Sequence, residues 1–332
     1  MEQRPRRARE LGIVPGELAA GPLKAITDVE GVRVGHTTID DGDLHTGVTA
    51  IVPPTVPVPA AVFTGNGYGK LVGTTQLDEL GVLETPILLT ATLSVFRVAD
   101  ALVGYLLERD PGLVTVNPVV GETNDGYLSD IRARPITAEH VLAALDGASA
   151  DLPAEGCVGA GTGTVALGYK GGIGTSSRVV EVARTPVTIG ALVQSNFGGT
   201  LTVLGVPAPA AELLDADFLE PPGGSCMIVV ATDAPLDARQ LGRVARRAVF
   251  AIGRVGASYS HGSGDYALAF STSTTGDRVE DQALTPLFTG VLDAVEEALL
   301  NSLLMATTTT GFAGRTAYAL PHDRLLRRLR TR

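Results

Sequence analysis

Ser225 lies where a segment rich in proline and glycine changes to a run of β-forming residues. Pro221, Pro222, Gly223 and Gly224 precede it, and the run CMIVVAT follows it. β-branched and apolar residues in such a run predict a strand. Two interpretations are open: the segment is a plain turn before a strand, or the peptide bond between Gly224 and Ser225 is itself cleaved.

Cleavage of that bond would give Ser225 a free α-amino group beside its own hydroxyl. A free α-amine has a pKa of about 8, so near neutral pH a useful fraction is an unprotonated base. One residue then supplies both nucleophile and general base, and no histidine is required. Glycine at position 224 suits this chemistry, because it exposes the carbonyl of the cleaved bond and tolerates strained backbone.

Three polar residues elsewhere could assist such a serine. Ser263 and Asp265 are two positions apart at the start of another predicted strand, so alternation puts both on one face and Tyr266 on the other. A hydroxyl and a carboxylate there could orient the amine and shuttle its proton. Asn196 ends the run VTIGALVQSN, and its side-chain amide could donate to a developing oxyanion. Taken alone, each also fits a cap or a turn.

The motifs of the better-known hydrolases and nucleotide-binding proteins are absent. There is no GxSxG or HExxH segment, the five histidines are scattered, and the two cysteines form no CxxC pair. In the glycine-rich segment 159–177, Lys170 lies between Tyr169 and Gly171, which does not match a phosphate loop. We therefore expect no metal and no other cofactor, and interpret the segment as backbone packed closely around a site.

Composition limits the classes of partner. Of 332 residues, 45% are hydrophobic and 19% charged, which is typical of a folded globular chain. The net charge of −10 argues against a nucleic-acid partner. No run of 18 apolar residues predicts a membrane span, and the first residues lack a stretch of signal-peptide length, so we expect a cytoplasmic protein. The arginines of the C-terminal PHDRLLRRLRTR indicate a solvated helix end more than a polyanion-binding tail.

Hydrophobic periodicity predicts long strands interleaved with amphipathic helices. One helix ends at Gly256 after apolar positions from Leu241 to Val255, another begins with Thr285 as cap and Pro286 in its first turn, and a third covers Leu93 to Arg109. The predicted strands are Val48 to Val52, Ala61 to Thr64, Val187 to Gln194, Cys226 to Thr232 and Ala267 to Thr274. Such a pattern suggests sheets between helical layers in one interwoven domain.

Seven ordered segments, which span nearly the whole chain, carry a resemblance to a known family. The chain resembles the self-processing aminopeptidases typified by L-aminopeptidase/D-esterase (DmpA type) and the β-peptidyl aminopeptidases. The segments are AITDVEGVRVGHTT (25–38), TGVTAIVP (46–53), PVVGETNDGYLSD (118–130), GAGTGTVALGYKGGIGTSSR (159–178), GALVQSNFG (190–198), GGSCMIVVATDAPL (223–236) and GSGDYALAFST (262–272).

The resemblance implies a fold, a processing event and a set of residue roles. The fold is an α/β (α+β) structure, a four-layer αββα sandwich similar to N-terminal-nucleophile hydrolases but with different connectivity. A single domain, residues 1–332, self-cleaves into chains 1–224 and 225–332 and forms homo-oligomers, often tetramers. The implied roles are nucleophile for Ser225, its serine and acidic partners for Ser263 and Asp265, oxyanion donor for Asn196, and a pocket position for Tyr127. Asp265 stands where some members have Glu, a shorter reach.

The activity implied is that of a serine aminopeptidase that releases N-terminal residues from small peptides, amides or esters through an acyl-enzyme. An endo-acting amidase on ω-amino acid oligomers or pantetheine-like amides, an acyl transferase, and an uncleaved non-catalytic homologue remain alternatives. An exopeptidase must neutralise the substrate ammonium, and Glu122, Asp125 and Asp130 are candidate acids. Cys226 stands where the family suggests an aliphatic residue, and we interpret it as a small core residue.

Overall fold

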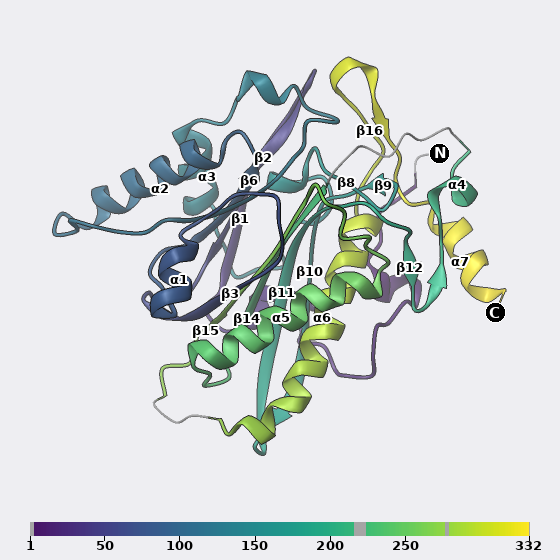
Figure 1. Cartoon of the computed structure of the whole chain (residues 1–332). Coiled ribbons are helices and arrows are strands. Elements are labelled where there is room, and N and C mark those ends of the chain that lie inside the picture. The colour runs from purple at the N-terminus through teal and green to yellow at the C-terminus, as the bar shows by residue number, and fades with distance from the viewer. Residues whose placement is uncertain (1–2, 216–223, 276–278, 332) are drawn as a thin grey trace.

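The computed structural model describes residues 3–215, 224–275 and 279–331 (Figure 1). Two sheets form its centre. The first has the strand order β1-β2-β6-β7-β4, and its central strands β6 and β7 run parallel and are buried along their whole length. Its strands are β1 (Arg33–Asp41), β2 (Leu44–Val52), β6 (Ile87–Ala91), β7 (Val119–Thr123) and β4 (Leu71–Val72).

The second sheet has the order β10-β11-β14-β15-β3-β5. Its two central strands, β14 and β15, are parallel, and the other pairings are antiparallel. Nearly continuous apolar runs make these central strands fit a position buried on both faces. The strands are β10 (Ile173–Val182), β11 (Thr185–Asn196), β14 (Gly224–Thr232), β15 (Ser263–Ser271), β3 (Val58–Gly67) and β5 (Val82–Leu83).

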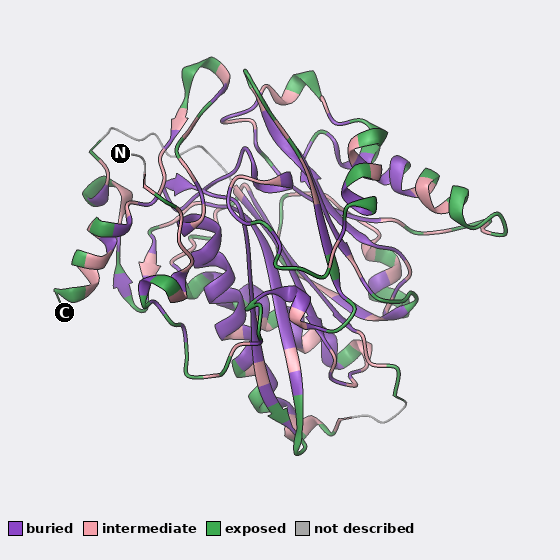
Figure 2. Ribbon diagram, turned by 180° about the vertical axis from the view of Figure 1, so that it is seen from behind, coloured by how far each residue is buried: buried purple, intermediate pink, exposed green. Residues whose placement is uncertain are grey.

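The two sheets face each other, and helices cover their outer faces (Figures 1 and 2). Helices α2 (Val95–Arg109) and α3 (Ala138–Asp146) pack on the first sheet, and α5 (Ala238–Arg254) and α6 (Thr285–Leu304) pack on the second. A middle core joins Ile51 and Leu89 of the first sheet to Val229 and Phe270 of the second. The four-layer αββα arrangement expected above is therefore confirmed.

Short elements complete the described part. They are helices α1 (Thr74–Leu80), α4 (Ala210–Leu213) and α7 (His322–Arg330), and the strand pairs β8 (Val165–Ala166) with β9 (Tyr169–Lys170), β12 (Thr202–Val203) with β13 (Val206–Pro207), and β16 (Thr309–Thr310) with β17 (Thr316–Ala317). Of the C-terminal arginines, Arg324, Arg327, Arg328 and Arg330 belong to a helix, α7, and Arg332 lies outside the described residues. Arg324 and Arg328 pair with Asp215 and Glu212 of the α4 region.

Three local predictions need correction. Thr285 is the first residue of α6 and does not cap it, because a 3-10 turn, Asp281–Leu284, runs directly into the helix. The strand expected to reach Thr274 ends at Ser271, and the helix expected from Leu93 begins at Val95 because Ser94 occupies its N-cap position. The turn expected at residues 221–223 lies outside the described residues.

Candidate active site

The ends of three neighbouring strands lie together at one end of the second sheet. β11 ends at Asn196, whereas β14 begins at Gly224 and β15 at Ser263. Because β14 runs antiparallel to β11 and parallel to β15, these ends lie side by side. The register pairs Asn196 with Ser225, and Ser225 with Gly264.

A cleft of about 1220 Å³ opens at this end of the strands. Segments far apart in the sequence form its walls: the second sheet contributes Ser225 and Asn196, and the chain after β7 contributes a short polar segment. The residues that line the cleft are Gly67, Tyr68, Gly69, Lys70, Thr92, Glu122, Asn124, Gly126, Tyr127, Ile131, Val165, Asn196, Gly224, Ser225, His261, Gly262 and Arg315.

The Ser225 hydroxyl is held close to the bond that precedes it. Its Oγ donates to the carbonyl oxygen of Gly224 at 2.7 Å and accepts from the backbone N–H of Gly264 at 3.3 Å. A Cβ atom on Gly224 would lie 2.6 Å from the Cα of Phe197 and 2.8 Å from the carbonyl oxygen of Asn196. The backbone approach is so close that position 224 requires glycine.

The side-chain amide of Asn196 lies on the same face of the second sheet as the Ser225 hydroxyl, and two hydrogen bonds fix its orientation. Its Oδ1 accepts from the backbone N–H of Val165 at 2.9 Å, and its Nδ2 donates to the carbonyl oxygen of Asn124 at 3.1 Å. A primary amide has two N–H donors, so one of them is left for another acceptor in the cleft.

Ser263 and Asp265 are joined to each other but do not line the cleft. The Ser263 hydroxyl donates to Oδ1 of Asp265 at 2.8 Å, as their alternation predicted. The parallel register pairs Asp265 with Cys226, so both side chains project towards α5 and α6, whereas Ser225 projects towards the first sheet. Burial raises the pKa of Asp265 to about 6, and the Ser263 hydroxyl and the Cys226 N–H partly offset this shift.

Cys226 is a core residue, as expected from its position in the strand. It has no exposed surface and packs in the core between the second sheet and helices α5 and α6. Burial raises the pKa of its thiol well above the usual value, and the nearby Asp265 carboxylate adds to the shift. It therefore does not compete with Ser225 as a nucleophile in the cleft.

Of the three candidate acids, only Glu122 lines the cleft. Its Oε1 accepts from the backbone N–H of Lys70 at 2.9 Å and lies 3.6 Å from the Nζ of the same lysine. Asp125 is buried elsewhere, and desolvation raises its pKa to about 7. Asp130 accepts from the backbone N–H of Arg132 at the start of a 3-10 turn.

Tyr127 lines the cleft beside an arginine that the sequence analysis missed. The guanidinium carbon of Arg315 lies 5.6 Å from the centre of the Tyr127 ring. Arg315 comes from the β16–β17 hairpin, nearly two hundred residues further along the chain. A lone arginine in a short hairpin has no periodicity or motif that could have identified it.

The described residues provide no group of three His, Cys, Asp or Glu side chains able to hold a metal ion. His36, for example, is buried, and desolvation lowers its pKa to about 4. In residues 3–215, 224–275 and 279–331, no helix combines the length and apolar character needed to cross a membrane.

Comparisons with known proteins agree with this geometry. Residues 24–317 match Peptidase family S58. The chain is 40% identical to β-peptidyl aminopeptidase BapA of Sphingosinicella xenopeptidilytica over 98% of its own length and 91% of that protein. A similar protein of Sphingosinicella microcystinivorans, with the same name, is 39% identical over 96% and 90% of the two chains.

Two solved structures extend these similarities to the fold. The L-aminopeptidase D-Ala-esterase/amidase of Ochrobactrum anthropi, described as a variant of the N-terminal-nucleophile hydrolase fold, matches with a TM-score of 0.91 and 36% identity over 98% of each chain. A β-aminopeptidase from a Burkholderia species matches with a TM-score of 0.91 and 40% identity, over 98% of this chain and 99% of that one. The resemblance found in the seven sequence segments is confirmed, as is the hydrolase class.

Proposed function

The chain belongs to peptidase family S58, and from this premise we propose that it is a self-processing aminopeptidase with Ser225 as its nucleophile. The observation that supports this proposal most strongly is the position of the Ser225 hydroxyl. It lies 2.7 Å from the carbonyl oxygen of Gly224 and at the same time faces a cleft large enough for a small peptide.

The first reaction is cleavage of the chain itself. Ser225 Oγ attacks the carbonyl carbon of Gly224, the C–N bond between the two residues breaks, and the nitrogen of Ser225 takes up the proton that leaves the hydroxyl. Water then hydrolyses the resulting ester and releases chains 1–224 and 225–332. The close approach of backbone at Gly224, where a Cβ would clash, supports a role for glycine at this bond.

The second reaction uses the new chain terminus. The freed amine of Ser225 accepts the proton of the hydroxyl, which attacks the substrate amide or ester and forms an acyl-enzyme that water resolves. The remaining N–H of Asn196 donates to the tetrahedral oxyanion. In this proposal Ser263 and Asp265 act on the freed amine of Ser225 from the other face of the sheet, where Asp265 already accepts from the backbone N–H of the next residue, Cys226.

Glu122 is our candidate for the group that binds the substrate ammonium. Among the described residues, both of its contacts involve Oε1, which leaves Oε2 for a substrate. A carboxylate on the wall of the same cleft as the nucleophile favours an exopeptidase over an endo-acting amidase, because only an exopeptidase has to bind a free amine.

Two measurements test the proposal. Denaturing electrophoresis of purified protein is expected to give two bands near two-thirds and one-third of the chain, and terminal sequencing is expected to find Ser225 at the start of the smaller one. Amino acid amides with a free amine are expected to be hydrolysed, and their N-acetylated forms are not. One uncleaved, inactive chain would favour a non-catalytic homologue, and equal rates on both substrates would favour an endo-acting amidase.

The assembly and location expected from the sequence remain predictions. A homo-oligomer, often a tetramer among relatives, is tested by light scattering, and a cytoplasmic location by cell fractionation. Small peptides, amides and esters are the proposed partners.

A further inference from the structure

We propose that Arg315 makes this enzyme prefer short peptides with a free carboxylate, by binding the carboxylate on the leaving-group side of the cleaved bond. This inference rests on the proposed aminopeptidase function and adds a specificity-determining residue to it. It starts from the positions of charged groups in the cleft.

Arg315 is an exposed guanidinium held at the cleft by its surroundings. Its Nη1 donates to the carbonyl oxygens of Gly126 at 3.3 Å and Tyr127 at 3.4 Å. The rings of Tyr127 and Phe312 flank the guanidinium carbon at 5.6 and 5.7 Å. Such contacts orient a guanidinium without neutralising it.

The hairpin that carries Arg315 is itself fixed to the cleft wall. The backbone N–H of Phe312 donates to the carbonyl oxygen of Leu128 at 2.7 Å, and Gly311 donates to the carbonyl oxygen of Arg315 at 2.9 Å. The arginine therefore starts from a defined backbone position, and binding a ligand there costs less conformational entropy than binding on a free loop.

No carboxylate forms an ion pair with Arg315 among the described residues, whereas Arg7, Arg9, Arg109, Arg178, Arg324 and Arg328 each have one. The other nitrogens of its guanidinium remain available, because the two described hydrogen bonds use only Nη1. A planar guanidinium with free N–H groups matches the geometry of a carboxylate.

Residues 122–127 form one stretch of the cleft wall, and three groups that could contact a substrate lie along it in sequence order. Glu122 lies at its start, the carbonyl of Asn124 touches the Asn196 amide in its middle, and Arg315 binds the carbonyls at its end. Gly126 is four positions after Glu122, so their Cα atoms are at most about 14 Å apart. A substrate with its ammonium at Glu122 and its reacting carbonyl near Asn196 directs its leaving group towards Arg315.

A dipeptide or tripeptide presents charges in this order: ammonium, reacting carbonyl, carboxylate. Each residue adds about 3.5 Å of extended length, so a dipeptide or tripeptide is about 7 to 11 Å long, within that upper limit. The carboxylate has two possible sources, the C-terminus of the peptide or an acidic side chain in its second residue.

The experiment first finds the amino acid amide, X-NH₂, that the wild-type enzyme hydrolyses fastest. The enzyme is then compared on X-Ala, X-Ala-NH₂ and X-Asp-NH₂. We expect kcat/KM for X-Ala to exceed that for X-Ala-NH₂ by about five- to tenfold at low salt, and the ratio to fall as salt is added. A high rate on X-Asp-NH₂ identifies a side-chain carboxylate as the better ligand.

Three variants separate the carboxylate contact from structural effects. Arg315→Met keeps the length of the side chain and is expected to bring the ratio of X-Ala to X-Ala-NH₂ close to one, with X-NH₂ hydrolysis unchanged. Arg315→Lys is expected to restore part of the ratio. Arg132→Met, a charge-matched change at an exposed arginine that does not line the cleft, is expected to leave the ratio as it is.

The inference is wrong if Arg315→Met retains the wild-type ratio while X-NH₂ hydrolysis continues, and the proposed function then stands. It is also wrong if the variant slows all substrates equally, because Arg315 then supports Tyr127 and does not bind a carboxylate. Failure of the wild-type enzyme to hydrolyse any X-NH₂ overturns the proposed function and this inference with it.

Discussion

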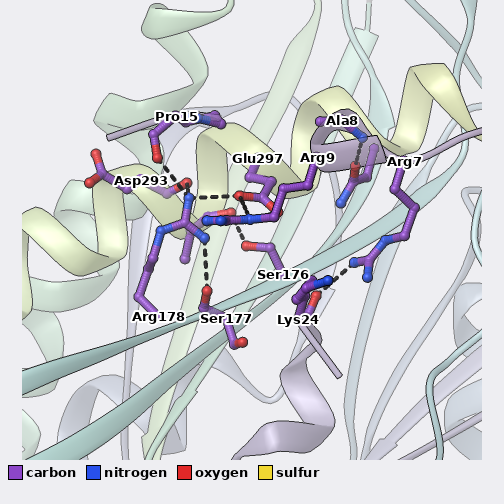
Figure 3. Close-up of polar contacts among 12 residues, drawn as sticks. Arg7, Ala8, Arg9, Pro15, Lys24, Ser176, Ser177, Arg178, Asp293 and Glu297 are labelled. Atoms are coloured by element: carbon purple, nitrogen blue, oxygen red, sulfur yellow. Dashed lines mark hydrogen bonds and ion pairs between the residues drawn. The ribbon is translucent and has the colours of Figure 1, made fainter. Parts of the chain in front are cut away.

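Two buried polar regions on either face of the second sheet differ in how their charges are satisfied. On the helix-covered face, Arg178 has no exposed surface, and its guanidinium donates to three backbone carbonyls and to Glu297 (Figure 3). The Nε–H of Arg9 is shared between the two carboxylate oxygens of Glu297, at 2.9 and 3.0 Å. At the cleft, Asn196 has one N–H without an acceptor and Arg315 a charge without a carboxylate partner among the described residues, whereas the Ser225 hydroxyl donates its single proton to the Gly224 carbonyl.

The difference shows how to separate groups that hold the fold from groups that can act on a substrate. A buried charge with several partners ties together distant segments, here residues 7–15, β10 and α6. The Nε of Arg178 has no acceptor among the described residues, but this side chain has no exposed surface, so a ligand cannot reach it. A group with unused hydrogen-bonding capacity that faces a cleft is instead available to a ligand. Four changes test this distinction, and they follow from the largest expected effect to the smallest.

Ser225→Ala is expected to abolish both cleavage and turnover, because the change removes the oxygen that forms both covalent intermediates. Electrophoresis after long incubation is expected to show one band, and amide hydrolysis is expected to fall to the background. Ser273→Ala, at a serine beyond the end of β15, is the control and is expected to mature normally. Two chains from Ser225→Ala would mean that another residue makes the cut.

Glu297→Gln is expected to destabilise the fold by about 3 to 5 kcal/mol, because it leaves Arg178 buried without its carboxylate partner. Urea unfolding in the Ser225→Ala background keeps every variant as one chain. Asp281→Asn, which breaks an exposed pair with Arg239, is the control, and we expect no resolvable change. An equal loss of stability in the two variants would contradict a special role for the buried network.

Asn196→Asp is expected to lower kcat by about 10² to 10³-fold and also to cost some stability, because the new carboxylate oxygen faces the Asn124 carbonyl oxygen that Nδ2 now bonds. The aspartate keeps the oxygen that accepts from Val165 but loses the donors and brings negative charge to the oxyanion. Steady-state kinetics on an amino acid amide, alongside urea unfolding, measures both effects. Wild-type kcat in a folded variant would remove Asn196 from the mechanism.

The raised pKa of Asp265 predicts how the rate of self-cleavage depends on pH. Its pKa in the folded chain is about 6, above the usual value because of burial, so the carboxylate ionises as the pH rises through 6. If the carboxylate is the form that assists, freshly made precursor is expected to cleave about tenfold faster at pH 7 than at pH 5. A time course on gels at each pH measures the rate.

Asp265→Asn is the matched variant for that experiment, and we expect it to cleave slowly with a flat profile. Its stability at neutral pH is not expected to fall. The raised pKa means that the fold favours the protonated carboxyl, and the stability from this preference is fully present below pH 3.8 and lost as the pH rises through 6. A rate that still rises through pH 6 in the variant would assign the ionisation to another group.

Much of the candidate site could be predicted from the sequence because it depends on local order. The run after Ser225 predicts a strand from Cys226 to Thr232, and β14 covers Gly224–Thr232. Two-residue spacing predicts that Ser263 and Asp265 share a face, and the 2.8 Å bond between them agrees. The helix expected to end at Gly256, which the structure ends at Arg254, and the burial of Cys226 follow equally from periodicity. These features need only the geometry of one strand or one helix.

Contacts between side chains from distant segments depend on the tertiary structure. Alternation within β15 does not predict that Asp265 lies beside Cys226 and away from the Ser225 hydroxyl, because those positions depend on the register between β14 and β15. Nor could it select Glu122 over Asp125, or bring Arg315 to Tyr127, since packing between sheets and a distant hairpin sets those contacts. Local sequence order therefore accounts for the elements and for the choice of Ser225 as the candidate nucleophile, whereas packing between distant segments sets what surrounds it.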